Sequence, residues 1–168
     1  KIPIDRDAVL ARIDACRAPA GSALKTRHHG DYHLGQVLIA NNDFLIIDFE
    51  GEPSRPLEEG RRKHSPLRDV AGMLRSFNYA KWSAHMRARE ADPNTAKLMA
   101  ELDDWEARTR QAFLEAYFGQ SGLDAADLGG LLDLAEIEKA LYELRYEASN
   151  RPDWIHIPLQ GLQSKIST

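Results

Sequence analysis

The sequence predicts a mostly helical α+β domain with one short β-hairpin near its start. From about residue 65 onward, apolar residues recur every three or four positions, which is the period of amphipathic helices. Before that point, two short apolar runs flank a turn of Asn and Asp residues. The chain has 168 residues and is 43% hydrophobic. That size suits one domain, which buries roughly two thirds of the surface exposed by its unfolded chain.

Composition excludes several classes of protein. The net charge of −4 argues against a nucleic-acid-binding domain, since such domains are usually basic. No apolar run approaches the roughly 20 residues that cross a bilayer. One cysteine, Cys16, rules out an internal disulfide framework and fits a reducing cytosol. The chain starts with Lys and shows no signal-peptide pattern, so we expect a cytoplasmic protein of which this chain is one piece.

The first predicted element is a short amphipathic helix over residues 4–16. Val9, Ile13 and Cys16 recur on one face of it, after an Asp at position 5 that suits a helix start. On that face Cys16 is expected to act as a small buried hydrophobic residue, because free cysteines are among the most buried residue types.

A β-hairpin is predicted next. Its strands are the apolar runs 36–40 and 44–47, separated by Asn41-Asn42-Asp43. Asn and Asp tolerate left-handed backbone angles, so this separator is a credible hairpin turn. The second strand leads directly into an acidic segment that begins at Asp48.

Three helices are predicted in the rest of the chain. Ser65-Pro66 starts the first, with Ser as N-cap and Pro at the first helical position, and Asp92-Pro93 ends it. The second ends at Gly119, and the last covers residues 131–148 before Asn150-Arg151-Pro152 stops it. The apolar faces are expected to be Val70, Leu74 and Phe77, then Leu98, Leu102, Trp105, Phe113 and Tyr117, and finally Leu134, Leu141 and Leu144. Of the second set, Leu102, Trp105 and Phe113 are expected in the core.

Oxygen-bearing side chains flank the predicted hairpin. Asp31 precedes it and Asp48 follows it, while Gln36 stands at the start of its first strand. A hairpin folds back on itself, so residues at its two ends become neighbours in space. Two carboxylates and an amide carbonyl at one rim are ligands of the kind that Mg²⁺ prefers. The sequence therefore predicts a magnesium site at the base of the hairpin.

This order of residues resembles the catalytic centre of protein-kinase-like phosphotransferases. Their catalytic loop carries an Asp, a metal-binding amide five residues later, a hairpin, and then a metal-binding Asp followed by Phe. The matching residues are His29-Gly30-Asp31, Gln36 and Asp48-Phe49. The His-Gly-Asp form, with a second His at position 33, is similar to the small-molecule branch that includes aminoglycoside and choline kinases.

Longer matches resemble the maltokinase family. They are His-Gly-Asp-Tyr-His-Leu-Gly-Gln-Val-Leu from residue 29, Ile-Asp-Phe-Glu-Gly-Glu-Pro from residue 47, and Ser-Pro-Leu-Arg-Asp-Val-Ala-Gly-Met-Leu from residue 65. The resemblance implies ATP-dependent phosphorylation of maltose to maltose 1-phosphate, which feeds trehalose and glycogen metabolism. It also implies a possible fusion to trehalose synthase, and it leaves another glucoside open as the acceptor.

The resemblance also implies roles for single residues. Asp31 would orient the sugar hydroxyl and accept its proton, while Gln36 and Asp48 would hold Mg²⁺ against the phosphates of ATP. Gln36 replaces the commoner Asn with a carbonyl one methylene further out, and Glu50 replaces the Gly of ordinary protein kinases. The residues expected to support the loop are His29, His33 and Asp69. For His33, the sequence leaves open whether it steadies the loop or approaches the phosphates.

The chain lacks the other half of such a site. No Gly-rich loop and no strand with a phosphate-binding Lys precede His29. We therefore expect residues 1–168 to be the C-terminal catalytic lobe of a kinase-like fold, inactive without the N-terminal ATP-binding lobe.

Residues that bind the sugar are harder to predict. Carboxylates, an arginine and aromatic rings have suitable chemistry, and the candidates are Glu50, Glu52, Arg68, Tyr142, Glu147 and Trp154. Packing is an equal alternative for Tyr142 and Trp154.

Two other functions compete with the kinase hypothesis. A metal-dependent phosphoesterase would use His29 and His33 with Asp31 as metal ligands, although the other histidines follow no metal-binding pattern. The non-enzymatic alternative is a regulatory, catalytically silent module attached to a partner enzyme. The retention of Asp31, Gln36 and Asp48 argues against it.

Overall fold

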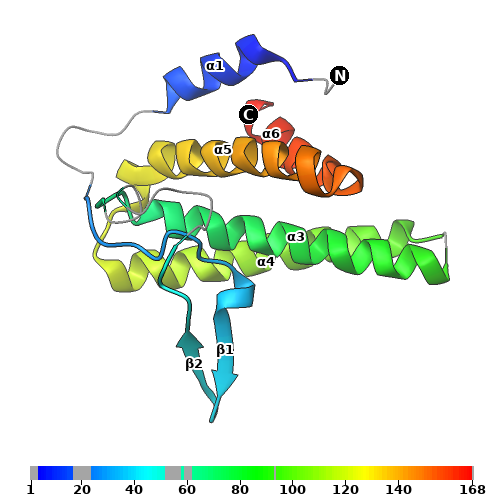
Figure 1. Cartoon of the computed structure of the whole chain (residues 1–168), viewed down its shortest axis with the longest axis horizontal. Helices are drawn as coiled ribbons and strands as arrows, with labels where there is room; N and C mark the ends of the chain where they lie inside the picture. Colours follow the sequence, from blue (N-terminus) through cyan, green and yellow to red (C-terminus); the bar gives the residue numbers. More distant parts are fainter. Residues whose placement is uncertain (1–3, 17–23, 52–57, 59–61, 93, 168) are drawn as a thin grey trace.

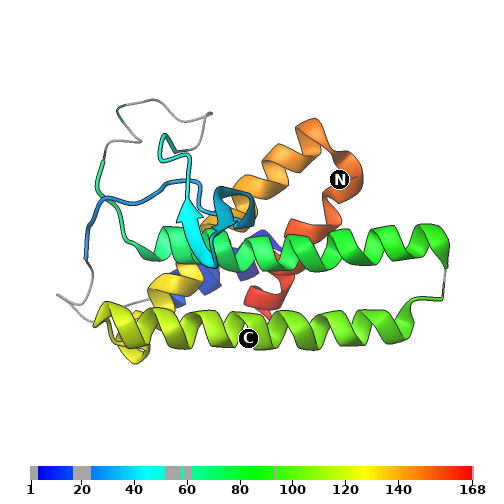
Figure 2. The same cartoon turned by 90° about the horizontal axis from the view of Figure 1, so that it is seen from below.

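The computed structural model describes residues 4–16, 24–51, 58, 62–92 and 94–167, which form a helical assembly with one two-stranded sheet (Figure 1). In chain order the elements are α1 (Arg6–Ala15), the 3₁₀ turn η1 (Leu34–Gln36), β1 (Val37–Ala40), β2 (Asp43–Ile46), α3 (Leu67–Ala91), α4 (Ala96–Ser121), α5 (Ala125–Asn150), the 3₁₀ turn η2 (Pro152–Trp154) and α6 (His156–Ile166). The long helices α3 and α4 lie side by side and antiparallel, and α5 packs across α3 (Figures 1 and 2). Within these residues, no helix has both the length and the apolar character needed to cross a membrane.

The predicted hairpin is confirmed. Strand β1 pairs antiparallel with β2, with Val37 opposite Ile46 and Ala40 opposite Asp43. Asn41 and Asn42 form the turn with φ values of 51° and 64°, the left-handed pair that a two-residue hairpin turn requires. The hairpin projects away from the helices (Figure 1), so its apolar side chains Leu38, Ile39, Phe44, Leu45 and Ile46 are exposed, whereas Val37 at its base packs against the core.

Helix α3 follows the sequence prediction within one residue. The helix begins at Leu67, so Pro66 and not Ser65 is its N-cap, although the hydroxyl of Ser65 still accepts a hydrogen bond from the backbone N–H of Leu67 at 3.3 Å. It ends at Ala91, immediately before the predicted break at Asp92. This helix supplies most of one core cluster and, as described below, holds the candidate site.

The boundary between α4 and α5 differs from the prediction. Gly122, with φ 69°, ends α4, whereas Gly119 continues the helix. Helix α5 begins at Ala125 and not near residue 131, because the carboxylate of Asp124 caps it by accepting the N–H of Ala126 at 2.8 Å. Gly129 and Gly130 favour a break by sequence, but the buried neighbours Leu128 and Leu132 hold that turn helical.

Two further features depart from expectation. Helix α6 was not predicted, although its residues Ile157 and Leu162 are buried in the core. Trp105 was expected in the core but is 37% exposed. It lies on α4, which packs on α3 through one side only and contains no fully buried residue. Leu102 and Phe113 are half-buried, and Phe113 packs against the α3–α5 core.

Helix α5 separates two clusters of buried apolar side chains. The first joins α3 to the start of α5 and contains Leu67, Val70, Ala71, Met73, Leu74, Phe77, Leu128, Leu132 and Ala135. The second joins α1, α5 and α6 and contains Val9, Cys16, Ile137, Ala140, Leu144 and Leu162. Burial of Val9 and Cys16 confirms the predicted inner face of the first helix.

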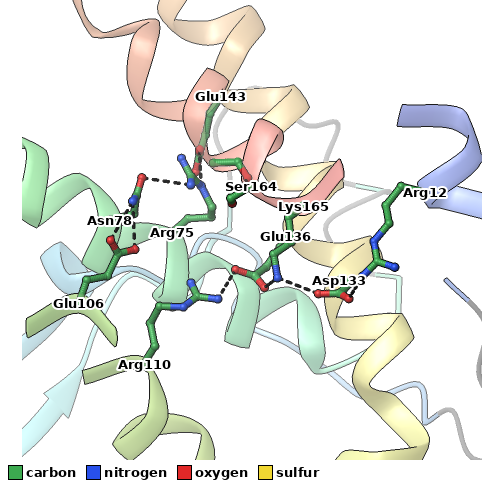
Figure 3. A network of polar contacts seen from close by, with 11 residues as sticks. Arg12, Arg75, Asn78, Glu106, Arg110, Asp133, Glu136, Glu143, Ser164 and Lys165 are labelled. Carbon is green, nitrogen blue, oxygen red and sulfur yellow. Dashed lines mark hydrogen bonds and ion pairs between the residues drawn. The ribbon is translucent and has the colours of Figure 1, made fainter. Parts of the chain in front are cut away.

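Ion pairs tie the helices together between these clusters (Figure 3). Arg75 of α3 binds Glu143 of α5 at 2.8 Å, and both side chains are buried. Arg110 of α4 binds Glu136 of α5 at 2.7 Å. Arg12 of α1 and Lys165 of α6 meet at Asp133 of α5, at 2.6 and 2.7 Å. Breaking a buried pair leaves an uncompensated charge, so the buried Arg75–Glu143 pair favours this packing of α3 on α5.

Candidate active site

One face of α3 holds the backbone of the loop that precedes the hairpin. The two carboxylate oxygens of Asp69 accept the backbone N–H groups of His29, at 2.6 Å, and Gly30, at 3.0 Å. Two turns later, the hydroxyl of Ser76 accepts the N–H of Leu34 at 3.0 Å. Hydrogen bonds to a charged acceptor are the stronger ones, so Asp69 is the main anchor of the loop on the helix.

Gly72 lies between these two anchors and allows the loop to come close. A β-carbon at Gly72 would lie 2.6 Å from the carbonyl oxygen of Tyr32, a separation that real β-carbons essentially never show. Asp69, Gly72 and Ser76 are spaced three and four residues apart and therefore share one face of the helix. Together they form the surface of α3 against which the main chain of residues 29–34 packs.

His29 ties the loop to the end of the hairpin. Its Nε2 donates to the carbonyl oxygen of Ile47 at 2.7 Å, and its Nδ1 accepts the N–H of Asp31 at 3.3 Å. The ring is buried and lies 5.0 Å from the ring of Phe49, between centroids. With both nitrogens engaged by the backbone, His29 is not placed to bind a metal, which removes one ligand of the phosphoesterase alternative. The part of the chain that the structure describes contains no group of three His, Cys, Asp or Glu side chains that could hold a metal.

Two glycines bring the loop against the turn after β2. Gly30 and Gly51 have φ values of 89° and 80°, in the left-handed region that favours glycine. A β-carbon on Gly30 would lie 3.3 Å from the Cα of Gly51. Asp48 also has a positive φ, 64°, which Asp tolerates better than most residues. The segments that carry Asp31 and Asp48 therefore meet at the base of the hairpin, as the sequence analysis expected.

Gln36 and Asp48 touch one another there. The amide Nε2 of Gln36 donates to Oδ2 of Asp48 at 2.9 Å. This bond leaves the Gln36 carbonyl oxygen and the other Asp48 oxygen as acceptors on an exposed rim. One carboxylate with one amide oxygen suits Mg²⁺, which proteins usually bind through one or two carboxylates together with substrate phosphates.

Asp31 has a cationic neighbour that sequence reasoning missed. The Nζ of Lys139, on α5, lies 3.3 Å from Oδ1 of Asp31. On the other side, Nε2 of His33 lies 3.8 Å from Oδ2 of Asp31. The Nδ1 of His33 accepts the N–H of Gly35, so His33 also caps the turn η1. Asp31 and Lys139 are 108 positions apart in the sequence, so no local pattern predicts this contact.

The predicted sugar-binding residues are distributed unevenly around Asp31. Tyr142 is connected to Asp31 through Lys139, whose Nζ lies 5.1 Å from the centre of the Tyr142 ring. Glu50 is exposed in the turn after Asp48, whereas Glu52 lies outside the described residues. Arg68 forms an ion pair with Glu138.

Trp154 belongs to a packed group of side chains. Its ring stacks on Tyr79 with centroids 6.3 Å apart, and the guanidinium of Arg151 lies 4.7 Å from its centre. Arg151 also donates two hydrogen bonds, at 2.6 and 2.9 Å, to the buried carboxylate of Glu147. The hydroxyl of Tyr79 donates to the same carboxylate at 2.9 Å, and burial together with nearby carboxylates raises the pKa of Tyr79. These contacts give Glu147 a structural role.

Known proteins resemble the chain at both sequence and structure level. It is 31% identical over 153 residues to a glucosamine kinase of Streptacidiphilus jiangxiensis, and 33% identical over 145 residues to one of Mycolicibacterium smegmatis. These matches cover 89% and 82% of this chain but 33% and 34% of the relatives. No family model matches the chain.

Solved structures of glucosamine kinase share the fold. One, in complex with glucosamine, ADP and inorganic phosphate, superposes with a TM-score of 0.70 at 23% identity, over 95% of this chain and 45% of that one. A second crystal form also gives a TM-score of 0.70, over 43% of its chain.

The fold is therefore the helical, hairpin-bearing part of an aminoglycoside-phosphotransferase-type kinase. More narrowly, the chain is similar in sequence to glucosamine kinases, and it spans about a third of the length of the curated relatives that it matches.

Proposed function

We propose that this chain is the C-terminal lobe of an ATP-dependent kinase that phosphorylates a hydroxyl group of a sugar. The observation that carries the proposal is the meeting of two segments at the base of the hairpin. One presents Asp31 beside Lys139, and the other presents Asp48 in contact with Gln36. Homology to glucosamine kinases supports the same class of reaction.

Each side chain has a task in this reaction. Asp31 accepts the proton of the sugar hydroxyl as the oxygen attacks the γ-phosphorus of ATP, and the bond from that phosphorus to the departing ADP breaks. Gln36 and Asp48 offer oxygen atoms that fit Mg²⁺, which when bound neutralises charge on the phosphates. His29 and Asp69 hold the backbone around Asp31 in place. Phosphoryl transfer depends on positioning and charge neutralisation more than on covalent chemistry, so a well-anchored loop suits it.

The proposed active protein needs an N-terminal lobe to hold the nucleotide. The relatives are about three times as long as their matched segment, which leaves length for such a lobe. The hairpin also presents apolar residues to solvent, with Ile39 79% and Phe44 71% exposed. Exposed apolar clusters of this kind mark surfaces that contact another domain or ligand.

The acceptor is the finer part of the proposal. Glucosamine is the first candidate, because the two curated relatives described above, which match 89% and 82% of this chain, are glucosamine kinases. Maltose, giving maltose 1-phosphate and feeding trehalose and glycogen metabolism, is the second candidate. The motifs from residues 29, 47 and 65 support it. A fused trehalose synthase is compatible with the maltose hypothesis. A catalytically silent regulatory module attached to such a partner enzyme is the alternative to the kinase function.

The test is ATP consumption by the lobe-complete protein, meaning this chain together with the remaining length that its relatives have. The acceptors are glucosamine, maltose, glucose, trehalose, choline and an aminoglycoside. Turnover with one of the sugars supports the proposal and identifies the acceptor. Turnover with only choline or the aminoglycoside supports the kinase mechanism but contradicts the proposal that the acceptor is a sugar. Mg-ATP binding without turnover on any of them favours the regulatory module.

A further inference from the structure

Asp31 sits between two basic side chains that contact its oxygens differently. Lys139 Nζ is within hydrogen-bonding distance of Oδ1, at 3.3 Å. His33 Nε2 is 3.8 Å from Oδ2, beyond hydrogen-bonding distance. Within the described part of the chain, Oδ1 therefore has a hydrogen-bond donor and Oδ2 does not.

The surroundings of Lys139 fix where its ammonium group lies. Its side chain is about a quarter exposed and lies over the ring of Tyr142, one turn along α5. Glu143, the residue after Tyr142, is also one turn from Lys139, and its carboxylate is buried against Arg75 of α3. The negative charge of Glu143 and the electron-rich face of Tyr142 both attract the Lys139 ammonium group.

We propose that Lys139 is a positioning residue for the kinase reaction: it holds Oδ1 of Asp31 so that Oδ2 is the oxygen that faces the acceptor hydroxyl. This inference rests on the proposed function. In the reaction, the proton of the hydroxyl passes to Oδ2, the new bond forms between the hydroxyl oxygen and the γ-phosphorus of ATP, and the electrons of the broken bond leave with ADP. A carboxylate anchored at one oxygen does not rotate away from the substrate, which preserves the geometry that in-line transfer requires.

Helix α5 thereby becomes part of the catalytic apparatus. The loop that carries Asp31 is bound to α3 through its backbone, while the Asp31 side chain is bound to α5. Because α3 and α5 are locked together by Arg75 and Glu143, backbone and side chain share one rigid base.

The experiment compares Lys139→Met and Lys139→Arg in the lobe-complete protein, with Arg145→Met as the matched control. Arg145 is an exposed cation on the same helix. Misplacing a reacting group costs up to about 100-fold in rate, so we expect Lys139→Met to lower kcat by about 10- to 100-fold with the KM for ATP nearly unchanged. Lys139→Arg should recover most of the loss, and Arg145→Met should behave as wild type.

A second readout does not depend on turnover. The ¹⁵Nζ–¹H signal of Lys139, assigned by its loss in Lys139→Met, should shift or broaden in Asp31→Asn and stay in place in Arg145→Met. If the wild type is active and Lys139→Met turns over at the same rate, this inference is wrong while the proposed function stands. The same holds if the Lys139 signal is unchanged in Asp31→Asn. A wild type that turns over no acceptor but shows the expected shift overturns the proposed function, and with it the catalytic part of this inference.

Discussion

The carbonyl oxygen of Tyr32 occupies the space where a side chain on Gly72 would begin. The separation from an ideal β-carbon at Gly72 is 2.6 Å. Tyr32 directly follows Asp31, so the closeness of this approach determines how far the proposed catalytic carboxylate stands from α3. A residue inside a helix, far from Asp31 in the sequence, thus sets the position of the loop.

Gly72→Ala should therefore displace the loop. Forcing a methyl group against a backbone carbonyl is overpacking, which typically costs about 1–3 kcal/mol of the free energy of unfolding. We also expect a loss of kinase turnover in the lobe-complete protein. Urea unfolding with Gly129→Ala as control measures the stability effect. Gly129 is also helical but has nothing within 4 Å of its ideal β-carbon, so alanine there should stabilise by about 0.5–1 kcal/mol. Equal effects of the two substitutions would contradict the role of Gly72.

Asp69→Asn should weaken the loop anchor. Asparagine keeps the shape but has one acceptor oxygen in place of two, so one of the N–H groups of His29 and Gly30 loses its partner. Leaving a buried donor unsatisfied costs about 1–3 kcal/mol. Thermal or urea unfolding measures this loss.

The control for Asp69→Asn is Asp104→Asn. It removes an exposed ion pair with Arg108 and should cost less than about 0.5 kcal/mol. Hydrogen exchange should become faster at the amides of His29 and Gly30 in Asp69→Asn only. Unchanged exchange at these amides would mean that Asp69 does not hold the loop.

Asp48→Ala tests the proposed magnesium site. Removing even an outer partner of a metal ligand usually costs about 10- to 100-fold in affinity, so losing a direct ligand should weaken Mg-ATP binding at least about tenfold. Calorimetry on the lobe-complete protein measures the affinity with and without Mg²⁺. Asp43→Ala, on the exposed hairpin, is the control and should leave the affinity unchanged. Equal Mg-ATP affinity of the wild type and Asp48→Ala would remove Asp48 from the site.

Cys16 should react slowly with thiol reagents while the protein is folded. Burial raises the pKa of its thiol, so less of the reactive thiolate is present near neutral pH. The side chain also packs in the α1–α5–α6 cluster. Alkylation followed by mass spectrometry should show a much faster reaction in urea. Equal rates in buffer and urea would mean that α1 does not stay packed on α5 and α6.

Local sequence signals predicted the parts of the fold that local chemistry decides. The left-handed Asn41 and Asn42 specify the hairpin turn, and Ser65-Pro66 marks the start of α3 to within one residue. The start of α5 could not be predicted from Gly129 and Gly130, because tertiary packing of their apolar neighbours overrides the low helix propensity of glycine. Trp105 fits the helical period of a buried face, yet no helix covers that part of α4 enough to bury it.

Some contacts of the candidate site could likewise be predicted from local sequence, and others could not. The spacing of Asp31, Gln36 and Asp48 around one hairpin is a short-range pattern, so the contact of Gln36 with Asp48 and the approach of the two segments that carry Asp31 and Asp48 could be anticipated. Lys139 reaches Asp31 from a helix that is distant in sequence, and no periodicity or motif connects the two. Residues that act through long-range contacts are visible only once the helices are placed in space.

The most direct test of the central claim is the rate of ADP formation by Asp31→Asn in the lobe-complete protein, with the sugar that the wild type prefers. Loss of a general base costs about 10²–10⁴ in rate, and the free energy of unfolding should change little because asparagine has the same shape and keeps an oxygen that can accept from Lys139. A fall of that size in a stably folded variant is the predicted result. Turnover within a few-fold of the wild type would contradict the assignment of Asp31 as the residue that accepts the proton.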